Sequence, residues 1–249
     1  MLHERLWDHC QHLVLRIMLG QEKGSDAKTR TLGTIQGLLL LIEWNPRRLH
    51  FPPPNDGWDS DLLMSSVVEE DERNELQKNP ARGRWLEDVI NPARRSGRMS
   101  WMLIGCATSL AFELRLLDES EQNNSNLMNT SAQGIQQQNR IRRLLHLYSE
   151  QLSLRMGLRS MTPQALSHRV FLGRGNLSML PAEEQAWQIC VSGWMELSRL
   201  VKSASDMLFP STAFTTEILQ SGRYVSLISH FQPLLSAWHD KYGTACGKS

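Results

Sequence analysis

The sequence predicts an all-α fold, a multi-helix, bundle-like domain. Apolar side chains recur every three to four residues along most of the 249-residue chain, which is the period of an amphipathic helix. No stretch of useful length shows the period of two that is typical of a strand. Prolines and polar capping residues fall where one helical pattern ends and the next begins. These three observations indicate that packed helices build the whole fold.

Three helices are expected in the N-terminal half. The first covers residues 2–19, and its expected core face consists of Leu6, Cys10, Leu13 and Ile17. The second covers residues 31–44 and ends before Pro46, which cannot continue a helix. Residues 69–97 are expected to be irregular because they are charged and broken by Pro80 and Pro92. The third helix, residues 98–117, is apolar on most faces and is therefore expected at the centre.

The C-terminal half begins with a polar segment. Residues 119–138 are rich in Asn, Gln and Ser and are predicted to be a mobile linker or surface insertion, a possible boundary within one domain of residues 1–249. Helices are then expected at 139–156, briefly after Thr162-Pro163, at about 182–208 and at 212–239. The helix after Pro181 starts with Glu183 and Glu184, which the helix dipole favours. The last helix is expected to kink at Pro233.

Composition limits the classes of partner. Lys and Arg number 27 and Asp and Glu 26, a net charge of +1, so any grip on DNA is expected from another segment. Cys10, Cys106, Cys190 and Cys246 form no CxxC pair, so they are expected to be reduced in an intracellular compartment. The longest apolar run has five residues, Leu38 to Ile42, whereas a membrane span needs about 20. We expect a soluble protein without a membrane partner.

No catalytic constellation emerges from the sequence. His3, His9 and His12 are the best metal-like cluster, but they fit surface histidines of an amphipathic helix better than a zinc site. The Gly173–Gly175 turn lacks the preceding strand and the following Lys-Ser or Lys-Thr of a phosphate loop. The acidic run of residues 69–72 is expected to be solvated. The chain is therefore predicted to have no catalytic, cofactor-binding or metal-binding residues and not to be an enzyme.

Arginines and tryptophans are the candidate functional residues. Two arginine groups each lie near the start of a helix and either are solvated or cap acidic groups across a domain interface. Tryptophans on helices either pack in the core or form the walls of a pocket for a flat or apolar effector. The candidate interface or effector residues are Arg94, Arg95, Arg98, Trp101, Arg140, Arg142, Arg143, Trp187 and Trp194.

Four segments resemble one family. Residues 34–41, Thr-Ile-Gln-Gly-Leu-Leu-Leu-Leu, then Trp44, resemble the "T-(I/V)-Q-A-L-L-L-L" helix of the middle homology region of fungal zinc-cluster transcription factors. Residues 101–114 are similar to that family's "W-x-L-x-G-x-A-x-R-L-A-x-E-L-G-L" helix, and residues 142–157 to its "R-R-R-L-F-W … D-x-x-L-S … G-R-P" segment. A weaker downstream pattern is matched by Gly222-Arg223-Tyr224, Pro233 and Trp238. The order and spacing of these segments carry the resemblance over residues 30–240.

The chain departs from the family pattern at several places. Arg115 stands where the central motif has glycine, Ser109 where arginine is common, and Leu158-Arg159 where Arg-Pro is expected. The six cysteines of the binuclear zinc cluster are absent, so the resemblance implies a chain that begins after the DNA-binding module. Zinc and DNA are then expected only in that missing module.

The resemblance implies the fungal-specific transcription factor domain, a nuclear regulatory domain that controls RNA polymerase II genes. Residues 49–53, Leu-His-Phe-Pro-Pro, resemble a subgroup that includes regulators of aromatic amino-acid catabolism, which suggests nitrogen or aromatic amino-acid metabolism. The expected partners are a second copy of the chain, other transcription proteins and a small-molecule effector. The alternative is a helical protein–protein interaction module, an adaptor or scaffold, unrelated to transcription. A helical lyase or hydrolase would need a polar pocket with convergent titratable groups.

Overall fold

The computed structural model describes residues 2–22, 28–44, 46–51, 84–117, 132–161 and 181–246. These residues form helices joined by turns and contain no strand, which confirms the all-α prediction. Within them, no helix combines the length and the apolar character needed to cross a membrane. The chain divides into two compact units, Met1–Leu114 and Arg115–Ser249.

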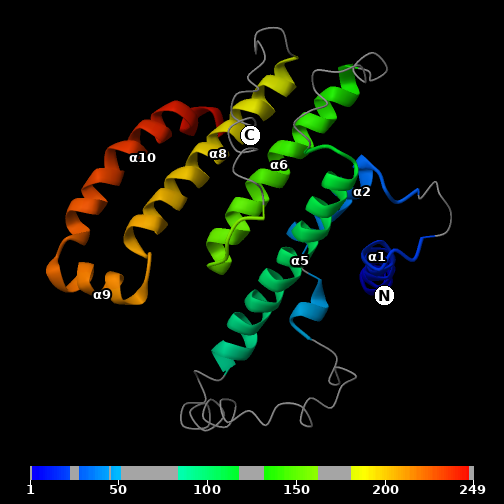
Figure 1. Ribbon diagram of the computed structural model, residues 1–249, viewed down its shortest axis with the longest axis horizontal. Helices are drawn as coiled ribbons and strands as arrows, with labels where there is room; N and C mark the ends of the chain where they lie inside the picture. The colour runs from blue at the N-terminus through cyan, green and yellow to red at the C-terminus, as the bar shows by residue number, and fades with distance from the viewer. Residues whose placement is uncertain are drawn as a thin grey trace. The chain divides into compact units, whose positions relative to one another are not determined.

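The first unit is built around two packed helices, α2 and α5 (Figure 1). Its elements are α1 (Leu2–Met18), α2 (Leu32–Glu43), the short η1 (Arg47–Leu49) and η3 (Leu86–Ile90), and α5 (Asn91–Glu113). The α2 helix begins where the Thr31 side chain accepts a hydrogen bond from the Thr34 backbone amide at 3.3 Å. The buried apolar residues of the two helices are Ile35, Leu38, Leu39, Ile42, Leu103, Ile104, Ala107, Leu110 and Ala111.

One prediction for this unit is wrong and one holds in part. The central helix begins at Asn91 rather than near Arg98, because Pro92 lies in its first turn, where a proline is tolerated. In α1 the expected core face is confirmed at Ile17, which is buried, and Cys10 and Leu13 are half-buried, but Leu6 is exposed and Trp7 is buried instead. The Trp7 ring meets the Trp44 ring edge-on at 5.6 Å, so α1 buries the side that carries this tryptophan.

The second unit consists of four described helices (Figure 1). They are α6 (Ala132–Met156), α8 (Ala182–Leu208), α9 (Thr212–Ser221) and α10 (Tyr224–Cys246). The α8 helix packs against both α6 and α10, and α9 joins the ends of α8 and α10. Its core includes Leu147, Val191 and Met195, with Trp187 packed against them.

Gly193 sets the close approach of α8 and α10. A Cβ atom at this glycine would lie 2.9 Å from the Tyr242 ring. Next to it, the Trp238 indole donates a hydrogen bond to the Gly193 carbonyl at 2.7 Å. Glycine at this position therefore brings one helix backbone against an aromatic side chain of the other.

The structure also corrects the predicted C-terminal elements. Residues 132–138, expected in the linker, are helical because they extend α6, whereas residues 118–131 and the predicted Thr162-Pro163 helix lie outside the described residues. The expected helix 212–239 is two helices, and α10 continues through Pro233. The break falls at Gly222, whose φ of 72° is the left-handed conformation that ends a helix and that glycine adopts readily.

Candidate functional site

The candidate site lies where α6 and α8 of the second unit pack together. Arg140 of α6 forms an ion pair with Glu184 of α8, a carboxylate that is only 3% exposed. Gln188, one turn further along α8, donates a hydrogen bond from Nε2 to the same carboxylate at 3.3 Å. A buried charge is tolerated when it is paired and hydrogen-bonded, as Glu184 is here.

Trp187 completes this contact. The Arg140 guanidinium carbon lies 5.0 Å from the centre of the Trp187 ring, within the range of a cation–π interaction. The remaining surroundings of Trp187 are apolar, because Trp187 packs on Leu147, Val191 and Met195. We call Arg140, Glu184, Trp187 and Gln188 the α6–α8 clamp.

The charge of Glu184 is stabilised within the clamp. Burial acts to raise the pKa of the Glu184 carboxyl, but the hydrogen bonds from Arg140 and Gln188 outweigh it and hold the pKa below its ordinary value. The carboxylate is therefore ionised at neutral pH, and the ion pair joins the two helices.

The other arginines of the second group also make local contacts. The Arg142 side chain donates from Nε to the Leu116 carbonyl at 2.5 Å and from Nη1 to Asn139 Oδ1 at 2.8 Å. Burial lowers the pKa of the Arg142 guanidinium. Arg143 is buried, with 9% of its surface exposed. Neither Arg142 nor Arg143 belongs to the clamp.

The first arginine group lies in the other unit. Arg95 donates to the Leu49 carbonyl at 2.8 Å and so ties α5 to the end of η1. Arg94 and Arg98 are exposed and form no ion pair with any residue that the structure describes. Trp101 is half-buried on α5. In the second unit, Trp194 is 37% exposed and its ring meets Tyr148 at 6.0 Å.

Sequence reasoning missed the role of Glu184. Glu184 matches the acids that favour a helix start, but it also shares one face of α8 with Trp187, Gln188 and Val191. An acid on the apolar face of a helix must find a partner, and the long arginine of a neighbouring helix can supply one. This spacing was the signal that could have found the pair.

The described residues offer no metal site. No three His, Cys, Asp or Glu side chains among them converge closely enough to hold an ion. Cys10, Cys106 and Cys190 form no disulfide, and the His3 ring packs edge-on against Trp44 at 5.1 Å.

The described elements are all helical, and the clamp residues connect two of them, α6 and α8. A comparison with curated proteins relates it to a named regulator. The chain is 43% identical over 246 residues to Transcription factor hmgR of Aspergillus fumigatus. The match covers 97% of this chain and 33% of the relative, so the chain spans about a third of that protein's length. No family model matches the chain, and no solved structure does.

Proposed function

We propose that this chain is a regulatory domain of a nuclear transcription factor that controls RNA polymerase II genes and has no enzymatic activity. The observation that carries the proposal is the 43% identity to Transcription factor hmgR over nearly the whole chain. The net charge of +1 supports a division of labour, in which a zinc-cluster module outside residues 1–249 binds DNA and this domain regulates it.

The target genes belong, in this proposal, to nitrogen or aromatic amino-acid metabolism. The residues after the first family motif, 49–53, support that assignment through their resemblance to one subgroup of the family. A second copy of the chain or other transcription proteins are the proposed partners.

The proposed mechanism is a shift between two packings of α6 and α8. The clamp joins these helices through the Arg140–Glu184 ion pair and the Arg140–Trp187 cation–π contact, and the Gln188 hydrogen bond within α8 holds the carboxylate in place. An effector or partner that favours the packing without this contact would shift the population toward it. The size of the response is set by the difference in affinity for the two packings.

A reporter assay in a fungal host tests the regulatory role. The chain is fused between a heterologous DNA-binding module and an activation domain, and the control replaces the chain with a flexible linker of equal length. We expect reporter output to differ by about fivefold at equal protein level, the lower end of measured allosteric couplings. Equal output from the two fusions would contradict the proposed regulatory role. In a gel-shift assay, sequence-specific DNA binding by the bare chain would contradict the division of labour.

A helical interaction module unrelated to transcription is the second candidate. It is favoured by the large apolar side chains that the second unit exposes, such as Phe209 at 65%, Leu219 at 59% and Val225 at 55%. For such a module, the chain fusion and the linker fusion would give equal reporter output. Fluorescence microscopy of the full-length protein would then show it outside the nucleus.

A further inference from the structure

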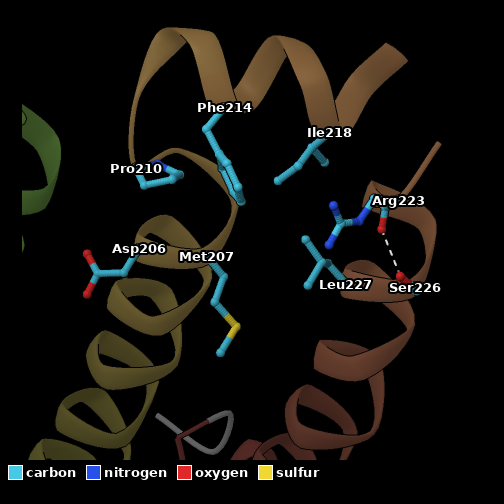
Figure 2. A pocket seen from close by; sticks show the side chains of 8 residues that line it. All are labelled: Asp206, Met207, Pro210, Phe214, Ile218, Arg223, Ser226 and Leu227. Carbon is cyan, nitrogen blue, oxygen red and sulfur yellow. Dashed lines mark hydrogen bonds between the residues drawn. The ribbon is translucent and has the colours of Figure 1, made fainter. Parts of the chain in front are cut away.

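The end of α8, the α9 helix and the start of α10 enclose a pocket that is separate from the α6–α8 clamp (Figure 2). Its volume is about 410 Å³, within the range of small-molecule sites. It is lined by Asp206, Met207, Pro210, Phe214, Ile218, Arg223, Ser226 and Leu227.

Two turns in the sequence build this pocket. Ser211 caps α9 by accepting a hydrogen bond from the Phe214 amide at 3.2 Å, directly after α8 has ended before Pro210. Gly222 ends α9 in the left-handed conformation, so that Arg223 and the first turn of α10 face the end of α8. The Gly222-Arg223-Tyr224 motif of the sequence thus forms one wall.

Arg223 supplies a positive charge at the open side of the pocket, where its side chain is exposed to solvent. Figure 2 shows its guanidinium group pointing inward between Ile218 and Leu227. It forms no ion pair with a residue in the described part of the chain. The Asp206 carboxylate points away from it in the same view and lies 3.9 Å from the Lys202 ammonium.

The surroundings of Arg223 favour an anion. From Met207 to Trp238 the sequence contains only two formally charged residues, Glu217 and Arg223. The guanidinium fork matches the planar geometry of a carboxylate.

The remaining walls are apolar and partly open to solvent. Met207 is 43% exposed and Phe214 39%, whereas Ile218 is buried. Covering the exposed parts of the thioether and the ring with an apolar group would remove them from water, which is favourable. The pocket therefore offers one anionic contact and an apolar surface beside it.

We propose that this pocket binds a small organic carboxylate with an apolar body. The carboxylate pairs with Arg223, and the body lies against Met207, Phe214 and Ile218. The binding does not depend on the proposed role in transcription, so the two can fail separately. If both hold, the ligand connects α8 to α10 and is the effector of the domain.

Nuclear magnetic resonance of methionine methyl groups tests the site on the 249-residue chain. Octanoate is the probe, and octanamide is the neutral analogue of the same shape. The methyl resonance of Met207 is assigned with Met207→Leu, and the other methionines serve as internal references. We expect octanoate to shift the Met207 resonance with saturation and octanamide to bind about tenfold more weakly, because it lacks the charge-assisted hydrogen bond.

Three variants distinguish this site from general apolar binding. Arg223→Met should weaken octanoate binding about tenfold and leave octanamide unchanged, whereas Phe214→Ala should weaken both probes. Arg155→Met, which removes an exposed arginine of α6, is the matched control and should change neither. Circular dichroism checks that each variant keeps its helices.

Two results would overturn the proposal. The first is equal affinity for octanoate and octanamide, or an octanoate affinity that Arg223→Met leaves unchanged. The second is no shift of the Met207 resonance at millimolar octanoate in the folded chain.

Discussion

The helix pair α2–α5 and the helix pair α8–α10 illustrate two ways of packing. In α2 and α5, nine apolar residues are buried, and Ile35, Ile104 and Ala107 have no exposed surface. In α10, by contrast, the large apolar residues Val225, Ile228 and Leu235 are exposed by 45% or more, and its buried apolar side chains are Phe231 and Tyr242. The first pair buries many of its apolar residues but exposes Leu40 and Met102, whereas the second exposes apolar residues along much of α10.

This difference indicates that the first pair mainly stabilises the fold, whereas the second pair also offers a surface for recognition. Burial of aliphatic side chains stabilises the first pair through the hydrophobic effect. Specific contacts also hold the second pair, namely the Gly193–Tyr242 approach, the Trp238 hydrogen bond and the Lys241–Glu196 ion pair at 2.9 Å. Its remaining apolar surface is available to a ligand or a partner.

The largest effect is expected from the α2–α5 core. Ile104→Ala should lower the free energy of unfolding by about 3–4 kcal/mol, because it opens a cavity in a fully buried site. Ile228→Ala, the same change on exposed α10, should stay within about 0.5 kcal/mol. Urea unfolding followed by circular dichroism measures both. Similar losses at the two sites would remove the contrast between the helix pairs.

The α6–α8 clamp should give the next largest effect. Arg140→Met leaves the Glu184 carboxylate buried without its ion-pair partner and should cost about 2 kcal/mol at pH 7, less than a fully buried pair because Arg140 is 40% exposed. The double variant Arg140→Met with Glu184→Leu should recover part of the loss, since no buried charge remains. A loss below about 0.5 kcal/mol for the single variant would show that the pair does not hold the helices.

The same pair predicts a pH dependence. The folded-state pKa of Glu184 lies below its ordinary value of 4.5, so its contribution to stability is complete above that value. The contribution is lost as the pH falls through the folded-state pKa. Glu184→Gln should therefore flatten the decline in stability below pH 4.5, measured as urea midpoints across that range. An identical decline in both proteins would contradict this role for Glu184.

A pair of glycine variants tests the close approach of α8 and α10. Gly193→Ala should destabilise the chain by about 1–3 kcal/mol, because the new Cβ atom would lie 2.9 Å from the Tyr242 ring. Gly37→Ala, in α2, meets nothing within 4 Å and should stabilise by up to about 1 kcal/mol through helix propensity. Thermal unfolding should show opposite shifts, and shifts of the same sign would mean that the helices do not meet closely at Gly193.

The smallest effect is expected at Arg115. This residue adopts a φ of 54°, in the left-handed region that disfavours a side chain, at the position where the family motif has glycine. Arg115→Gly should stabilise by about 0.5 kcal/mol after the greater freedom of the unfolded glycine is subtracted. Arg115→Val should destabilise by about 1 kcal/mol instead. Calorimetry of the two variants checks the signs, and equal effects would remove the link between the motif glycine and this turn.

Several elements could be predicted because their signals are local. The α2 helix has Thr31 as its cap and the α8 helix has acids in its first turn, and both lie close to where the sequence placed them. The start of α5 and the break between α9 and α10 were not predicted. A proline can interrupt a helix or lie in its first turn, and a glycine can end a helix or lie within one. The packing of the neighbouring segments places Pro92 in the first turn of α5 and Gly222 at the end of α9.

The candidate residues show the same division. The sequence identified Arg140 and Trp187, and their nearness to helix starts could be recognised from it. Their meeting with Glu184 depends on how α6 and α8 face each other.

By itself the sequence determined the all-α class, because the period of apolar residues along a helix is a property of the local chain. The caps at Thr31 and Ser211 are equally local, because each acts within three residues. Only the tertiary structure decided that Glu184 is buried beside Arg140 and that Arg223 points into an apolar pocket. Those contacts join residues far apart along the chain, and the packing of whole helix faces, rather than any short motif, brings them together.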